Sequence, residues 1–127
     1  MYDPTVVVHH HRRTIFAGHL RQIRSYALHR GFFVKKFPQT SMKLSYFVPS
    51  LFTAGTFLGW TAGYVWRPFF GLWLAVLGLY AILVCAFSLR TVNPLGVLGT
   101  AFGTFLTHVT YGIWFLKGLF ATELNDR

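Results

Sequence analysis

The chain has 127 residues, of which 54% are hydrophobic and only 12% are charged, and its formal net charge is +9. Soluble domains carry about 25% charged residues, so this composition argues against an ordinary soluble globular protein. The single cysteine, Cys85, excludes an intrachain disulfide.

The positive charge is concentrated near the N-terminal end of the chain. Eight of the 12 Lys and Arg residues lie within the first 43 residues, and the three acids are Asp3, Glu123 and Asp126. A basic segment joined to apolar segments favours anionic lipid headgroups as its first partner. Nucleic acid is the rival partner, but apolar spans would hold the basic segment at a membrane, so no nucleic-acid partner is predicted.

Residues 1–43 are predicted to form a basic cytoplasmic arm. Thr5 to Val8 favours a short strand because consecutive valines prefer a pleated backbone. From Thr14 to about Val34, apolar residues recur at helical spacing, which predicts an amphipathic helix lying in the membrane interface. Gly31 is expected to interrupt or end this helix. The cations predicted to bind lipid or a partner are Arg12, Arg13, Arg21, Arg24, Arg30, Lys35 and Lys36.

Three windows without any charge follow, at residues 44–66, 69–89 and 95–116. Each is about 20 residues long, which is enough to cross the hydrocarbon core of a bilayer as a helix. Residues 44–117 are therefore predicted to be a three-helix transmembrane domain, followed by a short tail at 118–127. The predicted fold class is all-α integral membrane. Because Lys and Arg mark the cytoplasmic side, the arm should be cytoplasmic and the C-terminus periplasmic.

Glycines recur at every fourth position in two of these windows. Small residues at this spacing allow close approach of helix backbones in lipid. The repeats are interpreted either as packing among the protein's own helices or as a docking face for another membrane protein. The glycines concerned are Gly55, Gly59 and Gly63 in the first window, and Gly99 and Gly103 in the third.

His108 is the candidate polar contact within the third window. A histidine in lipid needs a partner, and a hydrogen bond to a neighbouring helix is the first interpretation. Contact with a haem or a chlorophyll-type pigment is the alternative. No metal site is predicted, because His9, His10 and His11 have no Cys or acid nearby to complete four-coordination.

The sequence has no complete active site. No Asp or Glu stands between residues 4 and 122. Transfer of a sugar from a nucleotide donor needs acids to hold a divalent ion and a base to deprotonate the acceptor. The chain by itself is therefore not predicted to be an enzyme.

The stretch YDPTVVVHHHRR at residues 2–13 resembles the last strand and exit segment of bacterial membrane glycosyltransferases with an A-type nucleotide-sugar domain. Pro38 to Leu44 and Val48 to Phe52 resemble the linker and the first span entry of that family. The resemblance implies an interface helix under a catalytic domain, with Gln22 and Tyr26 near the acceptor and Arg12 and Arg13 near phosphates.

Two departures limit what this resemblance implies. Ser25 and Tyr26 occupy the Arg and Trp positions of the family's Gln-x-x-Arg-Trp signature. The donor-binding aspartates and the catalytic base of the family would precede the segment that matches here. Only the membrane scaffold is therefore carried over, and transferase activity is not.

The expected function is that of a non-catalytic membrane subunit, derived from a glycosyltransferase membrane domain and located in the bacterial cytoplasmic membrane. It would pack against other integral membrane proteins and anionic lipids in a hetero-oligomeric complex. One alternative is the membrane half of a split glycosyltransferase that acts on a lipid-linked acceptor. The other alternative is an accessory subunit of a respiratory or photosynthetic pigment–protein complex.

Overall fold

The computed structural model describes residues 16–90 and 93–124, except for the side chains of residues 94 and 95. The predicted strand at Thr5–Val8 and the candidate contacts Arg12 and Arg13 lie outside this part. Helices alone make up the regular structure of the described residues, which confirms the all-α fold class there. In chain order the elements are α1 (Ala17–Lys36), α2 (Pro38–Ser41), the 3₁₀ helix η1 (Leu44–Tyr46), α3 (Val48–Val65), α4 (Arg67–Leu89) and α5 (Pro94–Phe120).

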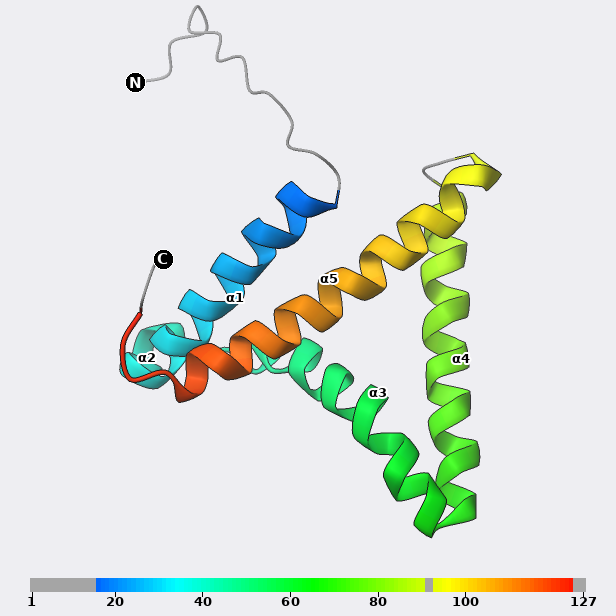
Figure 1. Ribbon diagram of the computed structural model, residues 1–127, viewed down its shortest axis with the longest axis horizontal. Helices are drawn as coiled ribbons and strands as arrows, with labels where there is room; N and C mark the ends of the chain where they lie inside the picture. Colours follow the sequence, from blue (N-terminus) through cyan, green and yellow to red (C-terminus); the bar gives the residue numbers. More distant parts are fainter. Residues whose placement is uncertain (1–15, 91–92, 125–127) are drawn as a thin grey trace, which may run out of the picture.

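The three uncharged windows of the sequence correspond to α3, α4 and α5. These helices form the sides of a triangle, and α1 lies beside the C-terminal half of α5 (Figure 1). One corner is the turn between α3 and α4, and a second is the connection from α4 to α5. At the third corner, α5 crosses the N-terminal end of α3.

Proline and one asparagine determine where the long helices begin. Pro49, Pro68 and Pro94 occupy the first turns of α3, α4 and α5. A missing N–H costs nothing there, because the first amides of a helix have no intrahelical acceptor. Asn93 caps α5, since its side chain accepts a hydrogen bond from Gly96 N at 2.8 Å.

Gly31 does not end α1, contrary to the expectation from the sequence, because the helix continues to Lys36. Gly31 is buried, and a Cβ added to it would lie 2.7 Å from the Leu119 nitrogen. On the facing helix, a Cβ added to Gly118 would lie 2.8 Å from the Leu28 carbonyl carbon. The two glycines therefore permit a backbone-to-backbone approach of α1 and α5 that a larger residue would prevent.

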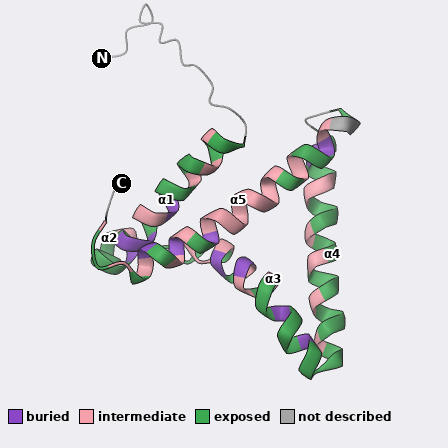
Figure 2. Cartoon of the chain, viewed as in Figure 1, coloured by how far each residue is buried: buried purple, intermediate pink, exposed green. Residues whose placement is uncertain are grey.

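The main apolar core lies at this same junction. Ala27, Val34 and Phe115 form a buried cluster between α1 and α5. Phe47, just before α3, packs edge-on against Phe115 with a centroid separation of 5.0 Å. Buried residues are sparse along α4, as Figure 2 shows.

Of the described helices, α4 is the one that is long and apolar enough to cross a membrane by length and composition. Only 6% of its most apolar window is buried inside the molecule. An apolar helix in the core of a soluble protein would instead be mostly buried. The three predicted spans thus all exist as helices, but this measure supports a membrane span only for α4; α3 and α5 do not meet it.

The glycine contact between α1 and α5 gives a test by substitution. Gly118→Ala places a methyl group against the backbone of α1 and should lower the free energy of unfolding by about 1–3 kcal/mol. Gly99→Ala in the same helix is the matched control, because a Cβ there meets nothing within 4 Å. The control should be neutral or more stable by up to about 1 kcal/mol, since alanine favours a helix. Thermal unfolding in mild detergent compares the two variants, and equal shifts would contradict the contact.

Candidate functional site

The candidate site is a layer made of α1, residues 103–120 of α5 and the following Ala121, called here the α1–α5 layer. The two helices run side by side in the same direction (Figure 1). The two helices contact each other at successive positions. At one end the Phe16 ring lies near Gly103, and at the other Lys35 Nζ donates a hydrogen bond to the Ala121 carbonyl oxygen. Between these ends, His19 Nε2 lies 3.2 Å from Thr107 Oγ1. The layer therefore extends over most of α1.

Two cations lie over one indole ring in this layer. The Arg24 guanidinium is 3.9 Å from the Trp114 ring centroid, and Lys117 Nζ is 4.4 Å from it. Each such cation–π contact contributes about 0.5–1 kcal/mol at an exposed site. The same indole thus contacts two like charges, one from each helix.

Arg30 makes a second contact of this kind. Its guanidinium lies 4.6 Å from the Tyr46 ring centroid. The Tyr111 hydroxyl beside it raises the pKa of Arg30, and burial of the guanidinium opposes this only in part. The Tyr111 oxygen is itself buried and makes no hydrogen bond of standard geometry within the described residues. Arg30 therefore remains charged at every physiological pH.

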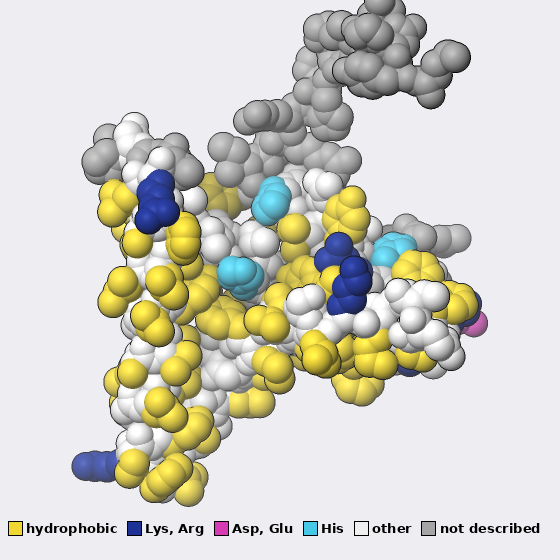
Figure 3. Space-filling model, turned by 180° about the vertical axis from the view of Figure 1, so that it is seen from behind, with side chains coloured by type: hydrophobic (Ala, Val, Ile, Leu, Met, Phe, Trp, Pro, Cys, Tyr) yellow, Lys and Arg dark blue, Asp and Glu magenta, His cyan; other side chains and the backbone are white. Residues whose placement is uncertain are grey.

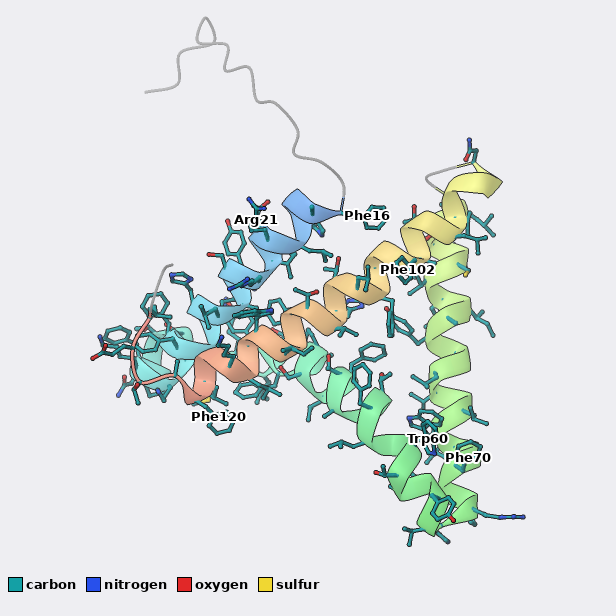
Figure 4. The ribbon with its side chains drawn as sticks, viewed as in Figure 1. Phe16, Arg21, Trp60, Phe70, Phe102 and Phe120 are labelled. Atoms are coloured by element: carbon teal, nitrogen blue, oxygen red, sulfur yellow. The ribbon has the colours of Figure 1, made fainter. Side chains whose placement is uncertain are left out.

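The predicted contacts on α1 that the structure describes are all exposed. Arg21 lies on the side of α1 away from α5 (Figure 4). The space-filling view shows Lys and Arg side chains in separate places, near the two ends of α4 and over the opposite half of the molecule (Figure 3). Glu123 is the only acid among the residues described, so almost no negative charge offsets the cations of the layer. The exposed members are Arg21, Gln22, Arg24, Tyr26, Arg30, Lys35 and Lys36.

The sequence did not indicate that Trp114, Lys117 and Tyr46 join these residues. In the sequence, Trp114 lies near the end of the third uncharged window and Lys117 directly follows that window. Their pairing with Arg24 links positions about 90 residues apart. No local pattern reports a contact of this range, so only the packing of α1 on α5 identifies it.

A smaller polar contact connects α4 and α5. The Tyr80 hydroxyl and His108 Nδ1 are hydrogen-bonded at 2.8 Å, so the predicted bond from His108 to a neighbouring helix is present. The Phe52 ring of α3 covers both, with centroid separations of 4.5 Å to Tyr80 and 5.9 Å to His108. Tyr80 also lines a groove of about 490 Å³ between α4 and α5, whose other lining residues are Leu83, Val84, Phe87, Ser88, Thr100 and Thr104.

The hydroxyls near this contact mainly bond to backbone. Thr104 Oγ1 donates to the Thr100 carbonyl, and Thr107 Oγ1 donates to the Gly103 carbonyl, both at 2.8 Å. Ser50 Oγ donates to the Gly112 carbonyl at 3.1 Å and so links α3 to α5. Such bonds satisfy hydroxyl groups in apolar surroundings. Over the described residues, no group of three or more His, Cys, Asp or Glu could hold a metal ion.

The predicted glycine faces divide into two kinds. A Cβ added to Gly59 would overlap the Trp73 indole, and one added to Gly63 would lie 2.7 Å from Phe70 Cδ2. The Gly55 carbonyl accepts a hydrogen bond from Trp73 Nε1 at 2.8 Å. Gly59 and Gly63 therefore pack within the chain, against α4, whereas a Cβ added to Gly55 would meet nothing within 4 Å.

In α5 the predicted glycines make far less contact. An added Cβ at Gly103 meets only Phe16, at 3.5 Å, and Gly99 has no neighbour within 4 Å. Gly112, which the spacing did not single out, is closely packed, since an added Cβ would lie 2.6 Å from the Pro49 oxygen. Of the predicted glycines, Gly99 and Gly55 thus have no neighbour within 4 Å of an added Cβ.

Comparison of the chain with protein-family models, with curated proteins and with solved structures gives no match. The family resemblance of the arm and the span entry therefore stays a prediction.

A double-mutant cycle measures the Tyr80–His108 bond. Tyr80→Phe and His108→Leu should each destabilise the folded state, and the double variant should lose less than the sum because both partners are gone. The expected coupling is about 0.5–1.5 kcal/mol. Tyr64→Phe is the control, since Tyr64 is 86% exposed and should change little. Unfolding in mild detergent gives the free energies, and purely additive losses would mean that the bond contributes nothing.

Proposed function

We propose that this chain is a non-catalytic integral membrane protein whose helices pack against lipid and against other membrane proteins. The exposed apolar surface of α4 carries the proposal. Soluble monomers rarely expose a continuous apolar patch larger than a few hundred Å². Large side chains are exposed from one end of α4 to the other: Phe70 39%, Leu72 62%, Leu74 49%, Val76 56%, Leu79 58%, Ile82 66%, Leu83 48%, Phe87 63% and Leu89 60%.

The charges support a membrane in the same way. Within α4 no charged side chain lies between Arg67 and Arg90, and these two arginines flank the helix at its two ends. An Arg at the centre of a span costs about 2.5–3.5 kcal/mol on insertion scales, whereas an Arg at the headgroups costs little. The cations of α1 add an attraction to anionic headgroups.

A role within a complex is the second part of the proposal. The face of α5 around Gly99 has space for the backbone of another helix, and Leu98 beside it is 76% exposed. Small residues with adjacent apolar side chains allow two helices of membrane proteins to pack closely. We propose that a second membrane protein packs there, so that the chain acts as a structural subunit of a bacterial membrane complex.

One observation favours a more specific version. Gln22 and Tyr26 are exposed on α1, where the resemblance to membrane glycosyltransferases would place the acceptor end of a transferase site. The chain would then be the membrane half of a split transferase, with the catalytic groups on a partner chain. Purification of the native protein in gentle detergent, with identification of the proteins that accompany it, distinguishes this version from a purely structural subunit. An absorption spectrum of the same preparation tests for haem or chlorophyll-type pigment.

Alkaline extraction tests the membrane assignment. We expect the chain to remain in the membrane pellet at high pH and to enter solution only with detergent. The reason is that burial of an apolar span is stable when surface electrostatic contacts are not. Release by alkali alone would contradict an integral membrane protein.

A further inference from the structure

We infer that the α1–α5 layer lies flat on the headgroups of one leaflet, and that only α3 and α4 cross the membrane, as a hairpin with Arg67 at its tip. This inference rests on the proposed membrane function. It replaces three crossings by two, and it places the two ends of the described chain on the same side.

The first argument is the meeting of the two ends of the predicted three-span unit. Phe47, at the entry to α3, packs on Phe115 near the end of α5. Ser50 bonds to the Gly112 carbonyl. A chain that crosses a membrane three times ends on the side opposite to where it began. The start of α3 and the end of α5 lie together instead, which requires an even number of crossings.

The second argument decides which helix does not cross. The C-terminal half of α5 carries α1 along it, from Gly103 to Ala121. α1 has cations along its length, including Arg21, Arg24 and Lys36. If α5 crossed the bilayer, these charges would enter the hydrocarbon with it, where each is strongly unfavourable. The layer therefore stays at headgroup depth, and α3 makes the second crossing.

The lengths of α3 and α4 and their lack of internal charge agree with a hairpin, although of the two only α4 also meets the hydropathy expected of a span. At 1.5 Å per residue, the 18 residues of α3 span about 27 Å and the 23 residues of α4 about 35 Å. A hydrocarbon core is about 30 Å thick. Figure 1 shows both helices leading away from α5 to their shared turn. Arg67 is the one described cation at that turn, and the others lie on α1, on the linker after it, at Arg90 or at Lys117. The rule that cations stay cytoplasmic then puts the layer on the cytoplasmic side.

Single cysteines in a Cys85→Ser background test this topology. Cys85 is the only native cysteine, so each introduced thiol reports alone. The positions are exposed: Gln39 after α1, Tyr64 near the tip of the hairpin, Leu89 at the end of α4 and Thr122 after α5. A membrane-impermeant maleimide is applied to right-side-out and to inside-out vesicles that contain each variant. We expect Gln39→Cys, Leu89→Cys and Thr122→Cys to react from the cytoplasmic side, and Tyr64→Cys to react from the other side.

Each other pattern overturns the inference. With three crossings, Thr122→Cys would react on the same side as Tyr64→Cys. With α5 crossing in place of α3, Leu89→Cys alone would react on the opposite side. Reaction of one position from both sides would mean mixed orientation and would also overturn it. Recovery of the chain in the soluble fraction before labelling would instead refute the proposed membrane function, so the two failures are distinguishable.

Discussion

The close approach of α1 and α5 is the contact on which the rest of the structure depends. Gly31 and Gly118 remove the side chains that would hold the two backbones apart. The approach buries Ala27, Val34 and Phe115 together. It also brings the cations of α1 next to Trp114 and Tyr46. Without these glycines, α1 would be a separate basic helix with no fixed relation to the apolar part of the chain.

In the membrane topology that we infer, this contact also determines which helices can cross the bilayer, because the charges of α1 limit where α5 can lie. A helix with several arginines cannot leave the headgroup region, and a helix packed closely along it cannot leave either. The uncharged window at residues 95–116 predicted a span for α5 from the sequence alone. In the topology that we infer, the position of α5 is instead governed by the helix that it contacts.

The contact at the α3–α4 corner of the triangle is of a different kind. Gly59 and Gly63 meet the side chains of Trp73 and Phe70, which can move, whereas Gly31 and Gly118 meet backbone. A side chain can rotate to accommodate an extra methyl group, and a backbone carbonyl in a helix cannot. The α3–α4 corner is therefore the more adaptable junction, and the α1–α5 layer is the more rigid one.

The sequence by itself determined the helices and their approximate limits. The absence of charge over three long windows, the prolines at their starts and the basic periodic segment before them are local features, and each has a local structural consequence. The hydrogen bond of His108 also followed from a general requirement, because a buried imidazole needs a partner. Gly31 was misinterpreted as a helix end because a lone glycine weakens a helix locally, whereas here packing against α5 compensates.

Only the tertiary structure decided which surfaces meet. Hydrophobic periodicity identifies an apolar face but not its partner, so the parallel pairing of α1 with α5 had no signature in either segment. Gly112 and Gly118 were not predicted as packing positions, because that prediction relied on glycines repeated at every fourth position. Close packing against a backbone needs only one small residue. The meeting of the α3 entry with the end of α5 likewise depends on angles between helices that are about 60 residues apart in the chain. Those angles arise from many weak side-chain contacts acting together. For that reason the uncharged windows of the sequence predicted three crossings, whereas the inference from the assembled helices has two.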